Sequence, residues 1–169
     1  MVNLSSLSQT HIIILFTALI LFLAFCFAYI FAKKLLPYYS RNFLLSKAEL
    51  RFFKMLQASV GDEYLIFSKI RIADVINCSD QNWKKGYGWK ITSKHIDFLL
   101  CEPESTKIIA AIELDDKSHN LPHRRKRDIF VNKAFESANI PLVRFEVSRG
   151  YDIAFLHKKL KLAISGHNA

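Results

Sequence analysis

The sequence predicts an α/β domain with a mixed sheet, preceded by one transmembrane helix. Three observations carry this prediction. An uncharged apolar run occupies residues 12–32. Further on, short segments with period-two alternation lie between segments with helical periodicity, in the order helix, three strands, helix, strand, helix. All charged residues stand at Lys33 or later, so the formal net charge of +9 belongs to the part that follows the apolar run.

Residues 12–32 are long enough to cross a hydrocarbon core of about 30 Å as a helix that rises about 1.5 Å per residue. A cleaved signal peptide is the competing interpretation, but it would need basic residues before its apolar core, and residues 1–11 contain neither Lys nor Arg. A lipoprotein attachment at Cys26 would need a small residue where Phe25 stands. We therefore expect a transmembrane helix.

The basic residues around the apolar run predict its orientation. Lys33, Lys34 and Arg41 follow it directly, and none precedes it. The positive-inside rule then predicts a single-pass protein of the inner (cytoplasmic) membrane, with residues 1–11 outside and the C-terminal domain in the cytoplasm. Residues 33–43 are expected to form a juxtamembrane linker, and residues 44–169 the domain itself.

Composition limits the partners of the domain. The 24 basic against 15 acidic side chains that follow the apolar run favour polyanions, so nucleic acid and anionic lipid head groups are the expected classes. A merely soluble basic surface is the alternative. The three cysteines are isolated, which argues against a zinc knuckle and against a disulfide scaffold.

The first helix of the domain should begin at Ser46. Ser46 and Glu49 have the spacing of a capping box, and Leu50, Phe53 and Leu56 would form the buried stripe. Glu49 therefore has two open interpretations, a helix cap and an acid of a functional site.

A half-buried strand is predicted for residues 64–72, with Ile66 and Ile70 on one face and Lys69 on the other. Residues 77–94 then read as a long polar loop in which lysines alternate with aromatic residues. Lys84 and Lys85 could contact phosphates there while the aromatic rings stack on bases. The alternative is a long hairpin loop whose tryptophans fold back on the domain.

Residues 95–101 and 108–114 are predicted to form a β-hairpin. A hairpin symmetric about Ser105 places Asp97 opposite Glu113, and Asp115 shares the strand face of Glu113. Like charges in such positions repel unless a cation lies between them, and carboxylates are the ligands that hard divalent cations prefer. A site for Mg²⁺ (or Mn²⁺) at Asp97, Glu113 and Asp115 is one interpretation. Pairing of these acids with nearby Lys and Arg side chains is the other.

A helix over residues 121–138 should follow, with Phe130, Ala134 and Ala138 as its core stripe. Its first turns carry consecutive basic residues that could neutralise a phosphodiester, although a charge run is often only a solvated face: Arg124, Arg125, Lys126 and Arg127. A strand at residues 142–147 and a last helix at residues 152–164 complete the domain. A strand, a helix and a strand so connected imply a right-handed parallel crossover.

Four segments of the chain combine acids with neighbouring apolar or basic residues: Leu45-Ser46-x-x-Glu49, Ile96-Asp97-Phe98, Ile112-Glu113-Leu114-Asp115-Asp116-x-x-His119 and Arg127-Asp128. This residue pattern is similar to the family called domain of unknown function 2726 and to the very-short-patch-repair endonuclease-like group, which carries a related E-x-D-G-x-x-H segment. The order of elements resembles the αβββαβ core of the restriction-endonuclease-like, or PD-(D/E)xK, superfamily.

The resemblance implies a membrane-anchored, metal-dependent nuclease. Asp97 and Glu113 would be magnesium ligands, and Asp115 a further ligand or a water-positioning acid. His119 would be a general acid or orient water, Glu49 would approach the metal from the first helix, and Arg124 or Lys117 would balance developing charge.

The chain departs from the superfamily at one position. Members usually carry a lysine where Asp115 stands, and the segment Asp115-Asp116-Lys117 supplies an acid-x-lysine only in a shifted frame. We prefer Glu113 with Asp115, as in the closer family. A catalytically inactive module that binds nucleic acid or a partner at the membrane is the alternative function.

Overall fold

The computed structural model describes residues 4–32, 36–116 and 122–167, with the backbone alone at residues 4–8 and 122–124. The chain divides into two compact units, Met1–Asn42 and Phe43–Ala169. The first contains helix α1 (Leu4–Ala32), whose segment Gln9–Ala32 is long and apolar enough to span a membrane.

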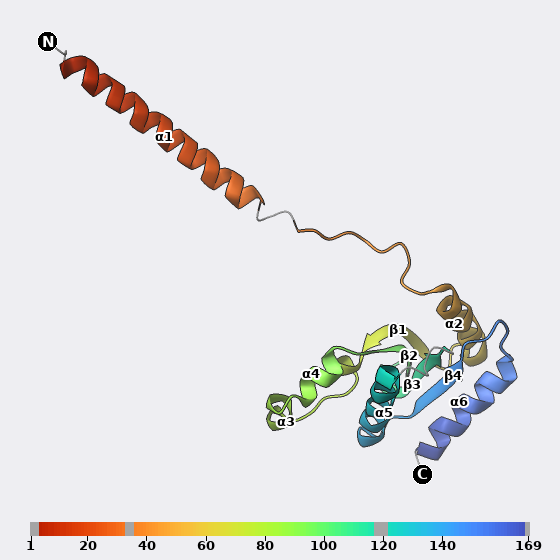
Figure 1. The fold of residues 1–169 in the computed structure, drawn as a ribbon. Coiled ribbons are helices and arrows are strands. Elements are labelled where there is room, and N and C mark those ends of the chain that lie inside the picture. Colours follow the sequence, from red (N-terminus) through yellow and green to blue (C-terminus); the bar gives the residue numbers. More distant parts are fainter. Residues whose placement is uncertain (1–3, 33–35, 117–121, 168–169) are drawn as a thin grey trace. The chain divides into compact units, whose positions relative to one another are not determined.

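The second unit is a three-layer α/β domain around a mixed sheet of four strands in the order β1-β2-β3-β4 (Figure 1). Strands β1, β2 and β3 are antiparallel neighbours, and β4 pairs with β3 in parallel, as predicted for a strand that follows a crossover helix. The elements in chain order are α2 (Lys47–Val60), β1 (Leu65–Arg71), the 3₁₀ turn η1 (Ile72–Asp74), α3 (Asp80–Lys84), α4 (Tyr87–Thr92), β2 (His95–Cys101), β3 (Ile108–Asp115), α5 (Pro122–Ser137), β4 (Leu142–Glu146) and α6 (Ile153–His167).

Each face of the sheet has its own apolar core. Helices α2 and α6 cover one face, where Phe52 and Leu156 pack in one cluster with Phe98 of β2. Helices α4 and α5 cover the other, where Ile91 and Phe135 join the cluster that contains residues of β2 and β3. Strand β3 has an almost continuous apolar sequence because helices cover the sheet on both of its faces.

Helix α2 begins as the sequence predicts, and two of its three predicted stripe residues pack in the core: Leu56 is fully buried, and Phe53 packs against the same cluster. Ser46 is the N-cap, and its reciprocal hydrogen bonds with Glu49 form the capping box. Phe52 is fully buried, whereas the predicted stripe residue Leu50 is 44% exposed. The prediction of Leu50 was wrong because helical spacing defines a stripe but does not say which neighbouring stripe meets the sheet.

Strand β1 reverses its faces at Lys69. Ile66 packs with the α2 side of the sheet and Ile70 with the α5 side, although strict alternation puts both on one face. The backbone of Lys69 has φ 58°, in the left-handed region, while Ser68 and Ile70 on either side keep the pairing with β2. One left-handed residue turns the strand over, so the predicted common face was wrong.

The β2–β3 hairpin keeps the register that symmetry about Ser105 predicts. Phe98 pairs with Ile112 and Leu100 with Ala110, before a bulge near the turn shifts Cys101 onto Ile108. Asp97 precedes Phe98 on β2 and Glu113 follows Ile112 on β3, so the same antiparallel register places Asp97 beside Glu113.

The segment predicted as a long loop folds into the two short helices α3 and α4. Trp83 folds back over Gly88, where an added Cβ would lie 2.2 Å from the Trp83 ring. Trp89 instead is 70% exposed. The loop prediction was wrong because helices of five and six residues are too short to show a helical period.

Helix α5 also differs from its predicted core stripe. Among its described side chains Val131 and Phe135 are fully buried, each one position after the predicted Phe130 and Ala134. In α6 the buried residues are Leu156 and Leu160. The helix runs on to His167, past the expected end.

Candidate functional site

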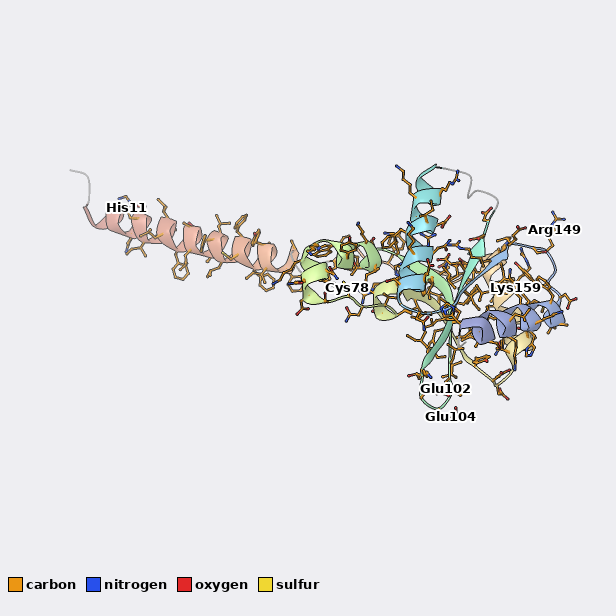
Figure 2. The ribbon with its side chains drawn as sticks, turned by 90° about the horizontal axis from the view of Figure 1, so that it is seen from below. His11, Cys78, Glu102, Glu104, Arg149 and Lys159 are labelled. Atoms are coloured by element: carbon orange, nitrogen blue, oxygen red, sulfur yellow. The ribbon has the colours of Figure 1, made fainter. Side chains whose placement is uncertain are left out.

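Four charged residues form a row across the sheet, one from each strand. The register places Lys69 of β1 opposite Asp97, because the pairs on both sides of it join Ser68 to Phe98 and Ile70 to Ile96. Asp97 lies beside Glu113, and Glu113 pairs with Arg144 of β4. Two acids on the central strands are thus flanked by two bases on the outer strands. The row lies toward the end of β3, away from the β2–β3 turn, where Figure 2 labels Glu102 and Glu104.

Asp97 is held at both of its carboxylate oxygens. Oδ2 accepts a hydrogen bond of 2.9 Å from the backbone N–H of Leu114 on β3, and Oδ1 accepts one of 3.0 Å from Lys69 Nζ. The charged residue in the middle of β2 therefore has a structural partner on each neighbouring strand, and its orientation is fixed.

Glu49 caps helix α2 and also contacts Lys69 of the row. Its Oε2 accepts a hydrogen bond of 2.7 Å from the backbone N–H of Ser46, as a capping residue does, while its Oε1 contacts Lys69 Nζ. Burial opposes ionisation of Glu49, but the hydrogen bonds from Lys69 and Ser46 outweigh it and hold its pKa below the ordinary value. The cap places a charged carboxylate beside the row.

Glu113 is the most deeply buried acid of the row, with 3% of its surface exposed. Burial raises its pKa to about 7, although Arg127 acts against the rise; the nearby Asp97 adds to it. Arg127 Nη2 from α5 lies 3.3 Å from Glu113 Oε1 and donates a second hydrogen bond of 3.1 Å to the backbone oxygen of His95. The basic start of α5 thus reaches the acids with at least one side chain.

Asp115 pairs with a base as well. Arg144 Nη1 lies 2.6 Å from Asp115 Oδ1, and Arg144 Nε donates a 3.1 Å hydrogen bond to Asn132 of α5. A second acid, Asp128, lies 3.7 Å from Arg144 Nη2. Arg144 therefore connects the end of β3 to α5. Its pairing with Asp115 is of the kind that the sequence allowed as the alternative to a metal site.

Carboxylate oxygens are the ligands that hard cations prefer, but Asp97, Glu113 and Asp115 are each paired with a base. Within residues 4–32, 36–116 and 122–167, no group of three or more His, Cys, Asp or Glu side chains is placed to hold a metal ion. However, Lys69 Nζ contacts oxygens of both Glu49 and Asp97, so these two oxygens lie close enough to share one positive charge. The Lys69 ammonium therefore lies where these two carboxylates could neutralise a bound cation.

Some of the predicted site residues lie elsewhere. Lys117 and His119, and the side chain of Arg124, fall outside the described residues. Arg125 and Lys126 are exposed in the first turns of α5. Lys84 and Lys85 are exposed at the end of α3. They lie in the segment between β1 and β2 that contains α3 and α4, here called the insertion, and not on the strands that carry the acids.

The insertion nevertheless approaches α5. Lys94, just before β2, lies with Nζ 5.0 Å from the centre of the Phe130 ring. Burial lowers its pKa, and so does the charge of Arg127 nearby. Lys94 and Arg127 of α5 therefore lie near one another at the surface.

Reasoning from sequence missed two bases of this site, Lys69 and Arg144. The sequence did offer one signal for these bases: two acids predicted on neighbouring strands require a positive charge nearby. Naming the bases needed the pairing of β1 with β2 and of β3 with β4, which joins residues far apart in the chain.

Comparison with known proteins identifies the family but no characterised relative. No curated protein and no solved structure matches the chain. The family model described as "Protein of unknown function (DUF2726)" matches residues 41–164, which include the whole row of charges. The chain therefore belongs to the DUF2726 family.

Proposed function

We propose that the domain is a metal-dependent nuclease-like enzyme that hydrolyses phosphodiester bonds of nucleic acid, on a restriction-endonuclease-like core. The observation that carries the proposal is the placement of Asp97 beside Glu113 on the two central strands, with Glu49 brought toward them by the capped start of α2. Glu113 is buried and Asp97 beside it is partly buried. Placing two acids side by side in this way is costly for a fold, and such costs are typical of functional sites.

Each described residue has a defined part in this proposal. Asp97 and Glu113 would hold Mg²⁺ or Mn²⁺, with Asp115 as a further ligand or as the acid that positions water. The ion supplies Lewis-acid polarisation of a phosphoryl oxygen and of the attacking water. Arg127, already beside Glu113, would neutralise charge on the substrate, and Arg125 and Lys126 would contact the neighbouring phosphates.

Membrane anchoring belongs to the same proposal. The helix that ends at Ala32 would cross the inner membrane once, and the basic residues that follow it in the sequence would keep the domain in the cytoplasm. The substrate would then be nucleic acid that comes close to the membrane surface, with DNA favoured over RNA.

A cleavage assay tests the enzymatic proposal. The full chain in a nonionic detergent is incubated with a mixed panel of DNA and RNA and with Mg²⁺ or Mn²⁺. We expect cleavage that requires the metal and that is lost in Asp97→Asn and Glu113→Gln. Glu104→Gln is the matched control, because this acid is exposed at the β2–β3 turn, and it should cleave normally (Figure 2).

A non-catalytic binding module is the second candidate. The observation that favours it is that Asp97, Glu113 and Asp115 each have a basic partner, so the fold balances their charges itself. This candidate predicts salt-sensitive binding of nucleic acid that survives removal of the acids, with no cleavage by any variant. Cleavage abolished by Asp97→Asn would exclude it.

A further inference from the structure

Lys69 occupies an unusual position for a lysine. It lies inside a β-strand, yet its backbone has φ 58°, a conformation that residues other than glycine rarely adopt. Strained backbone of this kind persists where surrounding structure enforces it, and it occurs often at functional sites. In this strand the left-handed residue reverses the faces of β1, and its side chain reaches acids of two other elements.

The contacts of Lys69 define its chemical role. Its Nζ donates to Oε1 of Glu49 on α2 and to Oδ1 of Asp97 on β2, the latter at 3.0 Å. Burial opposes the charge, but these hydrogen bonds outweigh it and raise the pKa of Lys69 above its ordinary value. The side chain is therefore an ammonium ion at neutral pH and is not suited to accept a proton.

We infer that Lys69, which holds a cation position between Glu49 and Asp97, competes with a divalent metal for the Asp97 carboxylate, so that this residue sets the metal affinity of the site. The inference rests on the proposed function. A metal that uses Asp97 meets an oxygen already bonded to the ammonium, and two positive charges cannot share that oxygen without repulsion. Entry of the metal requires Lys69 to move away.

The surroundings of Lys69 allow such a movement. Its side chain is 31% exposed, and it ends a flexible four-carbon stem, so it can turn toward solvent while the strand keeps its pairing. Glu49 would keep its hydrogen bond to Ser46 and thus its place at the start of α2. Asp97 would keep its bond to the backbone of Leu114.

Replacing the amine by an apolar group of similar length tests the inference. Binding of Mn²⁺ alone is measured by isothermal titration calorimetry on the full chain in nonionic detergent, for wild type and for Lys69→Met. We expect the dissociation constant to fall at least tenfold in the variant. Without metal the variant should unfold at a lower temperature than wild type, because Glu49 and Asp97 lose their shared cation, and saturating Mn²⁺ should abolish that difference.

Three further variants make the measurement specific. Arg71→Met removes a base from the same strand, but from a half-exposed pair with Asp74, and should leave the Mn²⁺ affinity unchanged. Lys69→Arg keeps the charge and should keep the affinity close to that of wild type. Lys69→Gly removes the amine while suiting the left-handed backbone, so it should bind Mn²⁺ more tightly even if Lys69→Met does not fold.

The outcomes separate this inference from the proposed function. An unchanged or weaker Mn²⁺ affinity in both Lys69→Met and Lys69→Gly, with clear binding by wild type, overturns the competition but leaves the metal site in place. Absence of Mn²⁺ binding in wild type and in all variants overturns both proposals.

Discussion

The burial of Glu113 leads to a pH-dependent stability that can be measured without any substrate. The pKa of this carboxyl rises from an ordinary value of 4.5 to about 7 in the fold, mainly through burial. At 1.36 kcal/mol for each tenfold change in proton affinity, the difference corresponds to about 3 kcal/mol of unfolding free energy. Below about pH 4.5 both the folded and the unfolded state carry the proton, so nothing is lost. Between pH 4.5 and about 7 only the unfolded state releases it, and stability falls as pH rises.

Glu113→Gln removes this loss, since the amide does not ionise. The variant should therefore match wild type near pH 4.5 and be more stable at pH 8 by up to about 3 kcal/mol, which is roughly 10 °C in the unfolding midpoint. Urea unfolding of the full chain in nonionic detergent with a metal chelator, followed by tryptophan fluorescence, measures the difference at both pH values. Glu104→Gln, in the exposed turn, should show no change between them. Equal stability of Glu113→Gln and wild type at pH 8, or a less stable variant, would refute the reasoning.

Three other predictions concern the core, the insertion and the basic surface. Phe52→Ala should lower the unfolding free energy by about 3–5 kcal/mol, because Phe52 is fully buried and its ring centre lies 5.5 Å or less from those of Phe98, Phe145 and Tyr151. Urea unfolding measures the loss, and a loss below about 1 kcal/mol would contradict the described core. Gly88→Ala should displace the Trp83 ring, because the new Cβ would lie 2.2 Å from it. The displacement should shift the tryptophan fluorescence emission to the red, and an unchanged spectrum would mean that the two residues are not in contact. Arg125→Ala and Lys126→Ala should each weaken nucleic-acid binding uniformly across sequences and lower the slope of log affinity against log salt by about 1; retention of the full slope in filter-binding assays would remove α5 from the interface.

Local patterns in the sequence were sufficient to predict most of the fold. The capping box at Ser46 marks the start of α2, and the apolar alternation around a short polar turn defines the β2–β3 register. Both depend on residues close together in the chain, where geometry follows directly from spacing. The parallel pairing of β4 with β3 also followed, because a helix of this length between two strands leaves few other connections.

The features that sequence reasoning missed depend on contacts between distant segments. The left-handed backbone at position 69 has no signal in the sequence, because the residue there is a lysine and not the glycine or asparagine that usually adopts this conformation. The pairs of Lys69 with Glu49 and of Arg144 with Asp115 join strands to elements many residues away. The acids of the site could therefore be selected from the sequence, whereas the bases that balance them required the tertiary structure.

Metal binding tests the central claim most directly. Titration of the full chain in nonionic detergent with Mn²⁺, followed by calorimetry, should show saturable binding that Asp97→Asn and Glu113→Gln each abolish or greatly weaken and that Glu104→Gln retains. The account predicts this result because Asp97 and Glu113 lie side by side on the central strands. Absence of binding by wild type, or equal binding by all four proteins, would contradict it.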